Sequence, residues 1–290
     1  MSAGGRRLWL AGRAREPDAD YRLLNRAVHY GDGLFASMRI EGGRLLDPRL
    51  HAARLLAGAD RLMLAPPAGF EDEARIVDQL LAIADRLGVG ADADSVLRCQ
   101  WSAAGQTRGY GRERESVVLV EMFPVPDVRR PVVRVLPDGA VPLPAIPHVK
   151  SCSALPHVLA ARQAGRLGVD EAIRVHDGCL AEAIASNLFF ERGGRLFTPG
   201  PELPLYPGIL RQRVLEAARE VGIEAIEGRW SADDLLECEG AFLTNSVRGL
   251  EVVARLEDRG LAETPVIERV AGAVRELRDA DAIPIRMKRR

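Results

Sequence analysis

The stretch VPLPAIPHVKSCSALPHVLAARQAG, Val141 to Gly165, joins a proline-rich segment to a predicted helix at residues 155–167. The prolines continue upstream into PDVRRP, and closely spaced prolines favour linkers because they interrupt helices and sheets. We therefore place a domain junction here. We expect a smaller domain at residues 1–128 and a larger one at residues 129–290, in line with a chain of this length. Lys150 follows the junction, so we assign it to the larger domain.

Lys150 is unusual because 40 residues of the chain are basic, yet only Lys150 and Lys288 are lysines. Arginine can replace lysine in salt bridges, but it cannot lose a proton near neutral pH and attack a carbonyl. Apolar Ile146 and Val149 precede Lys150, and desolvation there would lower the pKa of its amine. The residue is therefore a candidate reactive amine, and the alternative is an ordinary surface lysine.

The composition indicates a soluble globular protein, with 47% hydrophobic and 28% charged residues and a net charge of −1. Such a balance predicts no nucleic-acid partner and no membrane binding. A run of apolar residues long enough for a membrane span or a signal peptide is absent from the sequence, so we expect a cytoplasmic protein. Four scattered cysteines and five dispersed histidines predict reduced thiols and no metal site.

Hydrophobic periodicity predicts helices and hairpins in both halves. In residues 34–40, the apolar residues at even positions alternate with Phe35, Ser37 and Arg39, as in a strand. The sequence Glu41-Gly42-Gly43 then predicts a turn into a short partner strand. Asp47-Pro48 resembles a helix start, with the helix continuing to about residue 62. Further helices are expected at residues 71–87, 155–167, 207–222 and 266–280, and further strands at 95–102, 116–122, 132–136, 171–176, 224–227 and 241–244. Residues 186–199 are expected to form a hairpin that closes near Gly193-Gly194. This mixture predicts an α+β fold.

Three separate segments carry groups that suit a phosphate. HAARL places Arg54 on a helix, PGILR opens a helix at Ile209 and Leu210, and FLTNS ends a strand at Ser246. A helix N-terminus presents free N–H groups and favours anions. Glu182 lies among apolar residues, and a buried carboxylate needs a partner. That partner could be a protonated heterocyclic nitrogen or one of the chain's arginines.

Taken in order, HAARL, the lysine before a helix, the E-x-x-x-x-N-L-F run from Glu182 to Phe189, PGILR and FLTNS resemble the fold-type IV pyridoxal-phosphate enzymes. This family contains the branched-chain and D-amino-acid aminotransferases and 4-amino-4-deoxychorismate lyase. The resemblance extends from about Tyr30 to Val253. It implies a two-domain α+β fold, pyridoxal 5'-phosphate as cofactor, a small-molecule substrate and a homodimer.

The resemblance also implies how the cofactor is held. Lys150 would bind it as an internal aldimine and then move protons. Arg54 would bind its phosphate, together with the main-chain N–H groups of Ile209 and Leu210 and with Ser246.

The same resemblance implies which residue contacts the nitrogen of the cofactor's pyridine ring. Glu182 would pair with the pyridinium nitrogen and keep it protonated, so that the ring accepts electrons. Asn187 would support the neighbouring loop. Many relatives have a tyrosine shortly after the lysine that contacts the ring hydroxyl, and here Ala154 stands in that position.

Three features resemble the lyase more than the aminotransferases. Arg108-Gly109-Tyr110 is similar to a glycine-rich loop of the lyases, in which Arg108 would bind a substrate carboxylate and Tyr110 would line the pocket. Ser37 stands where the lyases have a threonine that takes part in proton transfer. Asn245, before Ser246, is expected to contact the substrate.

The function implied first is therefore conversion of 4-amino-4-deoxychorismate to 4-aminobenzoate and pyruvate, a step of folate biosynthesis. Lys150 would remove a ring proton to form a quinonoid, and Ser37 or Lys150 would return a proton. An aminotransferase acting on branched-chain or D-amino acids would share every cofactor residue, and it is the main alternative. A non-catalytic metabolite-binding protein on the same scaffold is the third.

Overall fold

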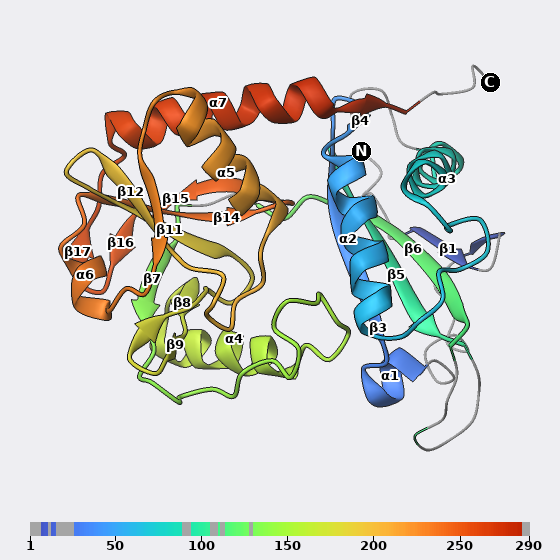
Figure 1. The fold of residues 1–290 in the computed structure, drawn as a ribbon, viewed down its shortest axis with the longest axis horizontal. Coiled ribbons are helices and arrows are strands. Elements are labelled where there is room, and N and C mark those ends of the chain that lie inside the picture. Colours follow the sequence, from blue (N-terminus) through green and yellow to red (C-terminus); the bar gives the residue numbers. More distant parts are fainter. Residues whose placement is uncertain are drawn as a thin grey trace. The chain divides into compact units, whose positions relative to one another are not determined.

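The computed structural model describes residues 7–10, 13–15, 26–88, 94–104, 110, 114–127 and 130–285. The chain forms two compact units. The first contains Met1–Pro126, Val149–Ser153 and Asp281–Arg290, and the second contains Asp127–His148 and Ala154–Ala280. Each unit combines helices with sheets (Figure 1), and the predicted α+β class is confirmed.

The first unit is built on an antiparallel sheet whose described strands lie in the order β18-β4-β3-β5-β6-β1-β2. Its strands are β1 (Arg7–Leu10), β2 (Arg13–Arg15), β3 (Gly33–Glu41), β4 (Arg44–Leu45), β5 (Ser95–Ala103), β6 (Ser116–Pro124) and β18 (Ile283–Pro284). Its helices are α1 (Arg26–Tyr30), α2 (Pro48–Arg61) and α3 (Glu73–Arg86).

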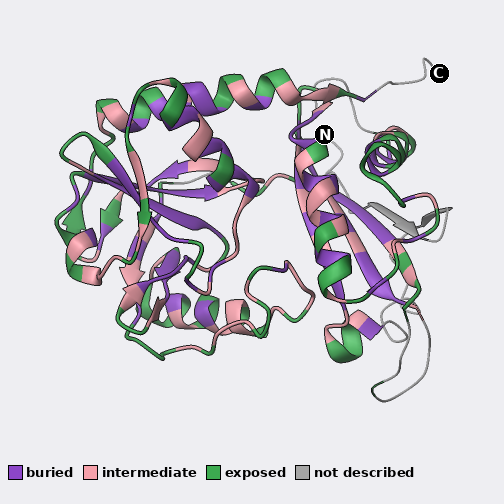
Figure 2. Cartoon of the chain, viewed as in Figure 1, coloured by how far each residue is buried: buried purple, intermediate pink, exposed green. Residues whose placement is uncertain are grey.

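Strand β3 separates the core of the first unit from the face that carries the candidate site. Leu34, Met38 and Ile40 are buried in one cluster with apolar residues of α2 and α3. Phe35 and Ser37 point to the opposite face, because successive side chains of a strand alternate. In Figure 2, buried, intermediate and exposed residues follow one another along α2, and most of the sheet behind it is buried.

Helix α2 begins at the predicted residue, but the way in which its start is stabilised differs from the prediction. Pro48 is the first helical residue, as expected, and Asp47 precedes it in the left-handed region at φ 53°. The Asp47 side chain makes no capping hydrogen bond to the helix. The helix start therefore relies on the preset φ of proline rather than on a side-chain cap.

The segment Val149–Ser153 belongs to the first unit, which differs from the predicted assignment of Lys150 to the second half. The Phe35 amide donates to the Lys150 carbonyl at 2.9 Å, and the Cys152 amide donates to the Gly33 carbonyl at 2.8 Å. Val149 is buried in the core of this unit. The segment therefore pairs with the beginning of β3, a long-range contact that a linear division of the sequence cannot represent.

The second unit contains two larger sheets. A five-stranded sheet has the order β13-β12-β11-β14-β15, and a four-stranded sheet has the order β17-β16-β7-β8. The bounds are β7 (Val132–Val135), β8 (Glu171–Ile173), β9 (Val175–His176), β10 (Cys179–Leu180), β11 (Asn187–Arg192), β12 (Arg195–Pro199), β13 (Ala225–Gly228), β14 (Gly240–Asn245), β15 (Gly249–Val252), β16 (Arg255–Leu256) and β17 (Arg259–Gly260), with α4 (Leu155–Leu167), α5 (Ile209–Glu220), α6 (Ala232–Leu236) and α7 (Pro265–Asp281).

Strand β11 is buried on both faces, which explains its uninterrupted apolar run. Phe189 stacks on Phe242 with ring centroids 5.1 Å apart, in a cluster with apolar residues of α5 and α7. Leu188 and Phe190 belong to a second cluster with residues of the four-stranded sheet. Helices α5 and α7 cover one face of the central sheet in Figure 1. Because both faces of this strand pack against apolar layers, its sequence does not alternate between apolar and polar residues.

Two short helices were not predicted. Residues 26–30 form α1 and residues 232–236 form α6, each only five residues long. The predicted strand at residues 171–176 is divided at Arg174 into β8 and β9. Helix α6 has a capping box in which Ser231 and Asp234 exchange hydrogen bonds, a sequence signal that could have identified it.

Candidate active site

Lys150 lies beside the first residues of β3, on the Phe35 side. Its Nζ atom is 5.0 Å from the centre of the Phe35 ring. The backbone pairing of Lys150 with Phe35 fixes its position relative to the sheet. Two residues later, burial raises the pKa of the Cys152 thiol to about 11. Lys150 itself is half-buried.

Arg98 is a second cation on this face, and the sequence interpretation did not include it. Its Cζ atom is 3.9 Å from the same Phe35 ring centre, so Arg98 Cζ and Lys150 Nζ are at most 8.9 Å apart, the sum of the two ring distances. Arg98 of β5 is the register partner of Ser37 of β3. Residues opposite each other in a sheet share a face, so Ser37, Arg98 and the Phe35 ring lie together near the lysine.

Arg54 lies on α2, near the point where this helix approaches the lysine segment. A Cβ atom at Gly58 would meet Leu34 Cδ1 at 2.8 Å and Val149 Cγ1 at 3.7 Å. Arg54 precedes Gly58 by four residues, which places it on the same side of the helix, roughly one turn or 5.4 Å away. Because α2 packs on the core face of β3 with Leu34, Arg54 lies on that side of the sheet, whereas Ser37 points to the other face.

The loop predicted to bind substrate is only partly described. Arg108 and Gly109 lie outside the described residues. Tyr110 is 97% exposed, and its ring lies 6.1 Å from that of Tyr30. The tyrosine contacts another exposed aromatic side chain and is not enclosed by the described residues of its own unit.

Glu182 is the centre of a polar cluster in the second unit. Its side chain is buried, and its Oε1 atom accepts a short hydrogen bond from Arg174 Nη2. Its Oε2 atom accepts a hydrogen bond from the Tyr206 amide at 2.9 Å. His157 Nε2 of α4 lies 3.6 Å from Oε1. The structure therefore shows the arginine partner that the sequence left as an alternative, and it identifies that partner as Arg174.

Asn187 connects this cluster to the beginning of α5. Its Nδ2 atom donates to the Tyr206 carbonyl at 2.7 Å, and its Oδ1 atom accepts from the Gly208 amide at 3.2 Å. Gly208 is the N-cap of α5, and no side chain caps this helix. The side chains of Ile209 and Leu210 are buried in the core, while their main-chain N–H groups belong to the uncapped first turn, where an anion is favoured.

The turn after β14 contains Asn245 and Ser246. Asn245 Nδ2 donates to the Ala185 carbonyl at 2.6 Å, and its Oδ1 accepts from the amides of Val247 at 2.9 Å and Arg248 at 3.3 Å. Both polar atoms of Asn245 therefore hold the turn. The Ser246 carbonyl accepts from Arg278 Nη2 of α7 at 3.0 Å.

A partly buried ion-pair network supports the same turn. Arg248 donates to Glu171 at 2.7 Å and to the Ser186 hydroxyl at 3.1 Å. Burial raises the pKa of the Glu171 carboxyl, while Arg248 opposes the rise. Thr244 Oγ1 is buried two residues before Ser246 and has no hydrogen-bond partner among the described residues. A hydroxyl group in this setting suits a polar ligand.

These groups fit pyridoxal phosphate. An amine is present for its aldehyde, an uncapped helix N-terminus suits its phosphate, and a buried carboxylate suits its ring nitrogen. The hydrogen bonds from Arg174 and from the Tyr206 amide use one lone pair of each Glu182 oxygen, so each oxygen retains a further acceptor site.

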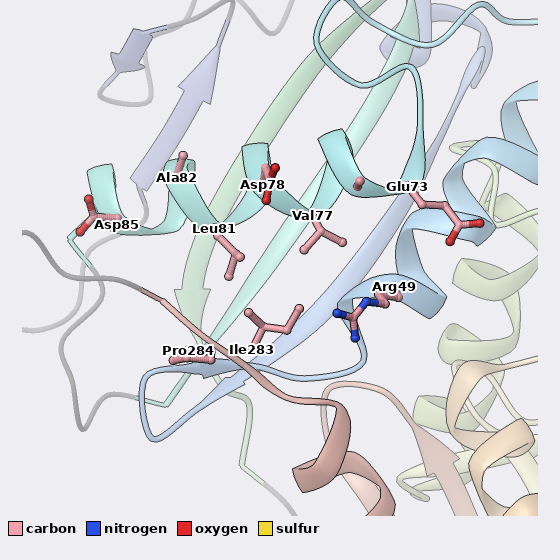
Figure 3. Close-up of a pocket in the computed structure, with 10 residues that line it drawn as sticks. Arg49, Glu73, Val77, Asp78, Leu81, Ala82, Asp85, Ile283 and Pro284 are labelled. Carbon is pink, nitrogen blue, oxygen red and sulfur yellow. The ribbon is translucent and has the colours of Figure 1, made fainter.

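A surface hollow of the first unit lies elsewhere. Figure 3 shows it between α3, with Val77 and Leu81, and the strand β18, with Ile283 and Pro284. None of the predicted site residues lines it. Within the described ranges, no group of three or more potential metal ligands occurs, the four cysteines are free thiols, and no helix has the length and apolar character of a membrane span.

Known proteins resemble the chain along most of its length. It is 27% identical over 256 residues to a Methanocaldococcus jannaschii protein provisionally named a branched-chain-amino-acid aminotransferase, covering 84% of this chain and 85% of that protein. It is 26% identical over 261 residues to the aminodeoxychorismate lyase of Bacillus subtilis, covering 84% of each. The structure of a Brucella abortus aminotransferase bound to pyridoxal phosphate matches with a TM-score of 0.81 at 24% identity, covering 94% of this chain and 99% of that one.

The structural match confirms the predicted fold. The family model for amino-transferase class IV covers residues 33–256, which is most of the chain. The resemblance inferred from the ordered motifs is thus confirmed. The chain belongs to the amino-transferase class IV family.

Proposed function

We propose that this protein is a pyridoxal-phosphate enzyme that transfers the amino group of an amino acid to a 2-oxo acid. The observation that carries the proposal is the placement of Lys150 beside Phe35, on the sheet face that also presents Ser37 and Arg98. An amine, a hydroxyl and a fixed cation are the groups that an amino-acid substrate with a carboxylate requires.

In this proposal, the residues that the sequence motifs assign to the cofactor bind it. Arg54, the N–H groups of Ile209 and Leu210, and Ser246 bind the phosphate, and Glu182 faces the ring nitrogen. When bound, pyridoxal phosphate supplies an aldehyde that condenses with amines and a ring that accepts electrons. The hydrogen bonds from Asn187 to the segment before α5 fix the phosphate-binding turn.

The remaining steps belong to the chain's own groups. Lys150 Nζ takes the proton from the substrate carbon and returns it, because an amine can change its protonation state there and arginine cannot. Arg98 binds the substrate carboxylate in this scheme, and Ser37 hydrogen-bonds to it or relays a proton. Arg98 thus takes the role that the sequence assigned to Arg108.

Aminodeoxychorismate lyase, the function that the sequence motifs favoured, is the second candidate. The Ser37 hydroxyl lies on the lysine's side of the sheet, where it could relay a proton, and a curated lyase is among the relatives. The aminotransferase is preferred because the Methanocaldococcus jannaschii relative, which is slightly more similar to this chain than the lyase, is named an aminotransferase. Tyr110, which was expected to line the lyase pocket, is exposed.

Two assays distinguish these functions. An aminotransferase should convert an amino acid and 2-oxoglutarate to glutamate, whereas the lyase should release pyruvate and 4-aminobenzoate together from 4-amino-4-deoxychorismate. Lys150→Ala should abolish either activity, and borohydride reduction should label Lys150 in the cofactor-loaded parent protein. Lys288→Ala, which removes the other lysine, is the matched control and should keep both label and activity. A parent protein in which borohydride labels no lysine would favour the non-catalytic binding protein.

A further inference from the structure

Arg174 is a fully buried arginine that faces Glu182. It is 1% exposed and separates β8 from β9. The Arg174 amide donates to the Glu182 carbonyl at 2.9 Å, and the Ala181 amide donates to the Arg174 carbonyl at 2.8 Å. The backbone therefore fixes Arg174 opposite Glu182, and their side chains meet as an ion pair.

The charge of Arg174 is directed at this one carboxylate. Its Nη2 atom donates to Glu182, while its Nε and Nη1 atoms are buried and have no hydrogen-bond partner among the described residues. An arginine that only filled a structural role in a core would be expected to satisfy more of its donors. Burial of a guanidinium group is costly, so this arrangement calls for a functional explanation.

Both oxygens of Glu182 are fixed by the chain. Arg174 binds Oε1, the Tyr206 amide binds Oε2, and the titratable His157 of α4 also faces the carboxylate, with its Nε2 atom 3.6 Å from Oε1. Because Tyr206 and Gly208 are in turn bound by Asn187, the carboxylate has a defined position relative to the first turn of α5. This first turn is the proposed phosphate site, so the spacing between the two ends of the cofactor is set by one hydrogen-bonded network.

We propose that Arg174 is a positioning residue that holds the Glu182 carboxylate for the cofactor's ring nitrogen and shares its negative charge. This inference rests on the proposed function. A carboxylate that already carries a guanidinium attracts the ring-nitrogen proton less strongly than a lone carboxylate, because the two cations compete for one anion. Arg174 therefore has two effects, a geometric one on affinity and an electrostatic one on protonation of the ring.

Two substitutions separate these effects. Arg174→Met removes the charge and the hydrogen bond but keeps an unbranched apolar side chain. Arg174→Lys keeps the charge. The matched control is Arg213→Met, because Arg213 is likewise buried, at 5% exposed, and forms an ion pair, with Glu216 at 3.0 Å.

The experiment follows the visible absorption of the cofactor, first as it is added to the cofactor-free protein and then in the loaded protein. Titration with pyridoxal phosphate gives the affinity, and a pH series gives the pH at which the absorption of the bound cofactor changes. Arg174→Met should weaken binding by about tenfold or more, the size expected for a lost hydrogen bond to a charged group. Its absorption change should move to higher pH. Arg174→Lys should restore the pH profile, and Arg213→Met should change neither property.

A second measurement uses the protein without cofactor. Thermal unfolding of Arg174→Met, Glu182→Gln and the double variant should show that the double variant loses less stability than the two single losses together. Additive losses, or a parental pH profile in Arg174→Met, would overturn the inference. A parent protein that binds no pyridoxal phosphate would refute the proposed function itself. If the stability losses of Arg174→Met and Glu182→Gln were still non-additive in that case, Arg174 would be only a structural partner of Glu182.

Discussion

Gly208 is the point at which the proposed phosphate site depends most directly on close packing. A Cβ atom at Gly208 would lie 2.3 Å from Asn187 Oδ1. The backbone itself would accept alanine, since φ is −59° and ψ is 146°. Asn187 cannot move away cheaply because it is buried and bonds to both Tyr206 and Gly208. Gly208→Ala should therefore break these bonds or displace the beginning of α5.

The magnitude follows from the contacts that are lost. Overpacking by one methyl group costs about 1–3 kcal/mol, and each hydrogen bond contributes about 1 kcal/mol. We expect the free energy of unfolding of the second unit to fall by about 2 kcal/mol. Gly272 provides a control of opposite sign, because it lies within α7 and a Cβ atom there would meet nothing within 4 Å. Gly272→Ala should raise the free energy of unfolding by about 0.5–1 kcal/mol.

Urea unfolding followed by circular dichroism tests this reasoning on both variants and on Asn187→Ala with and without Gly208→Ala. In the Asn187→Ala background, the additional Gly208→Ala change should cost little, because the clashing oxygen is gone. The reasoning is refuted if Gly208→Ala is as stable as Gly272→Ala. It is equally refuted if Gly208→Ala costs as much without Asn187 as with it.

Two further predictions concern titrating groups. Burial raises the pKa of Cys152 to about 11, so at pH 8 the thiolate is rarer than in an ordinary cysteine, and alkylation measured by mass spectrometry should be about 100-fold slower than in the urea-unfolded chain. Asp234 has a lowered pKa, chiefly because its carboxylate accepts the Ser231 amide. Its stabilising effect should therefore be present above the unfolded-state pKa and be lost as the pH falls through the lower folded-state value. Asp234→Asn should thus reduce stability at pH 7 but not at pH 2–3, and an equal loss at both pH values in urea titrations would contradict this.

Local hydrophobic patterns predicted most helices and strands of this fold, because the spacing of apolar residues shows which face of an element is buried. The strand at residues 34–40 and the helix at 155–167 match β3 and α4, since alternation and helical spacing are both properties of neighbouring residues. The assignment of Lys150 to a half of the chain differs from the structure, because the pairing of residues 149–153 with β3 spans more than a hundred positions. No local pattern contains that information.

Long-range contacts also decide which residues meet in the candidate site, and the sequence did not predict them. The sequence correctly required a partner for Glu182, because a buried carboxylate without one is costly. With 38 arginines in the chain, nothing in the spacing selected Arg174, whose approach depends on the break between β8 and β9. Arg98 was missed for a related reason, since its position opposite Ser37 follows only from the register of β3 and β5.

The pairing of Glu182 with Arg174 does not compete with its proposed role at the cofactor. A carboxylate has about four acceptor sites, and the hydrogen bonds from Arg174 and the Tyr206 amide occupy one on each oxygen. The two interpretations that the sequence kept separate, an arginine partner and a ring-nitrogen partner, can therefore hold at once. In that case the arginine sets how strongly the carboxylate attracts the ring-nitrogen proton, so the strength of the electron sink depends on a residue that never touches the cofactor.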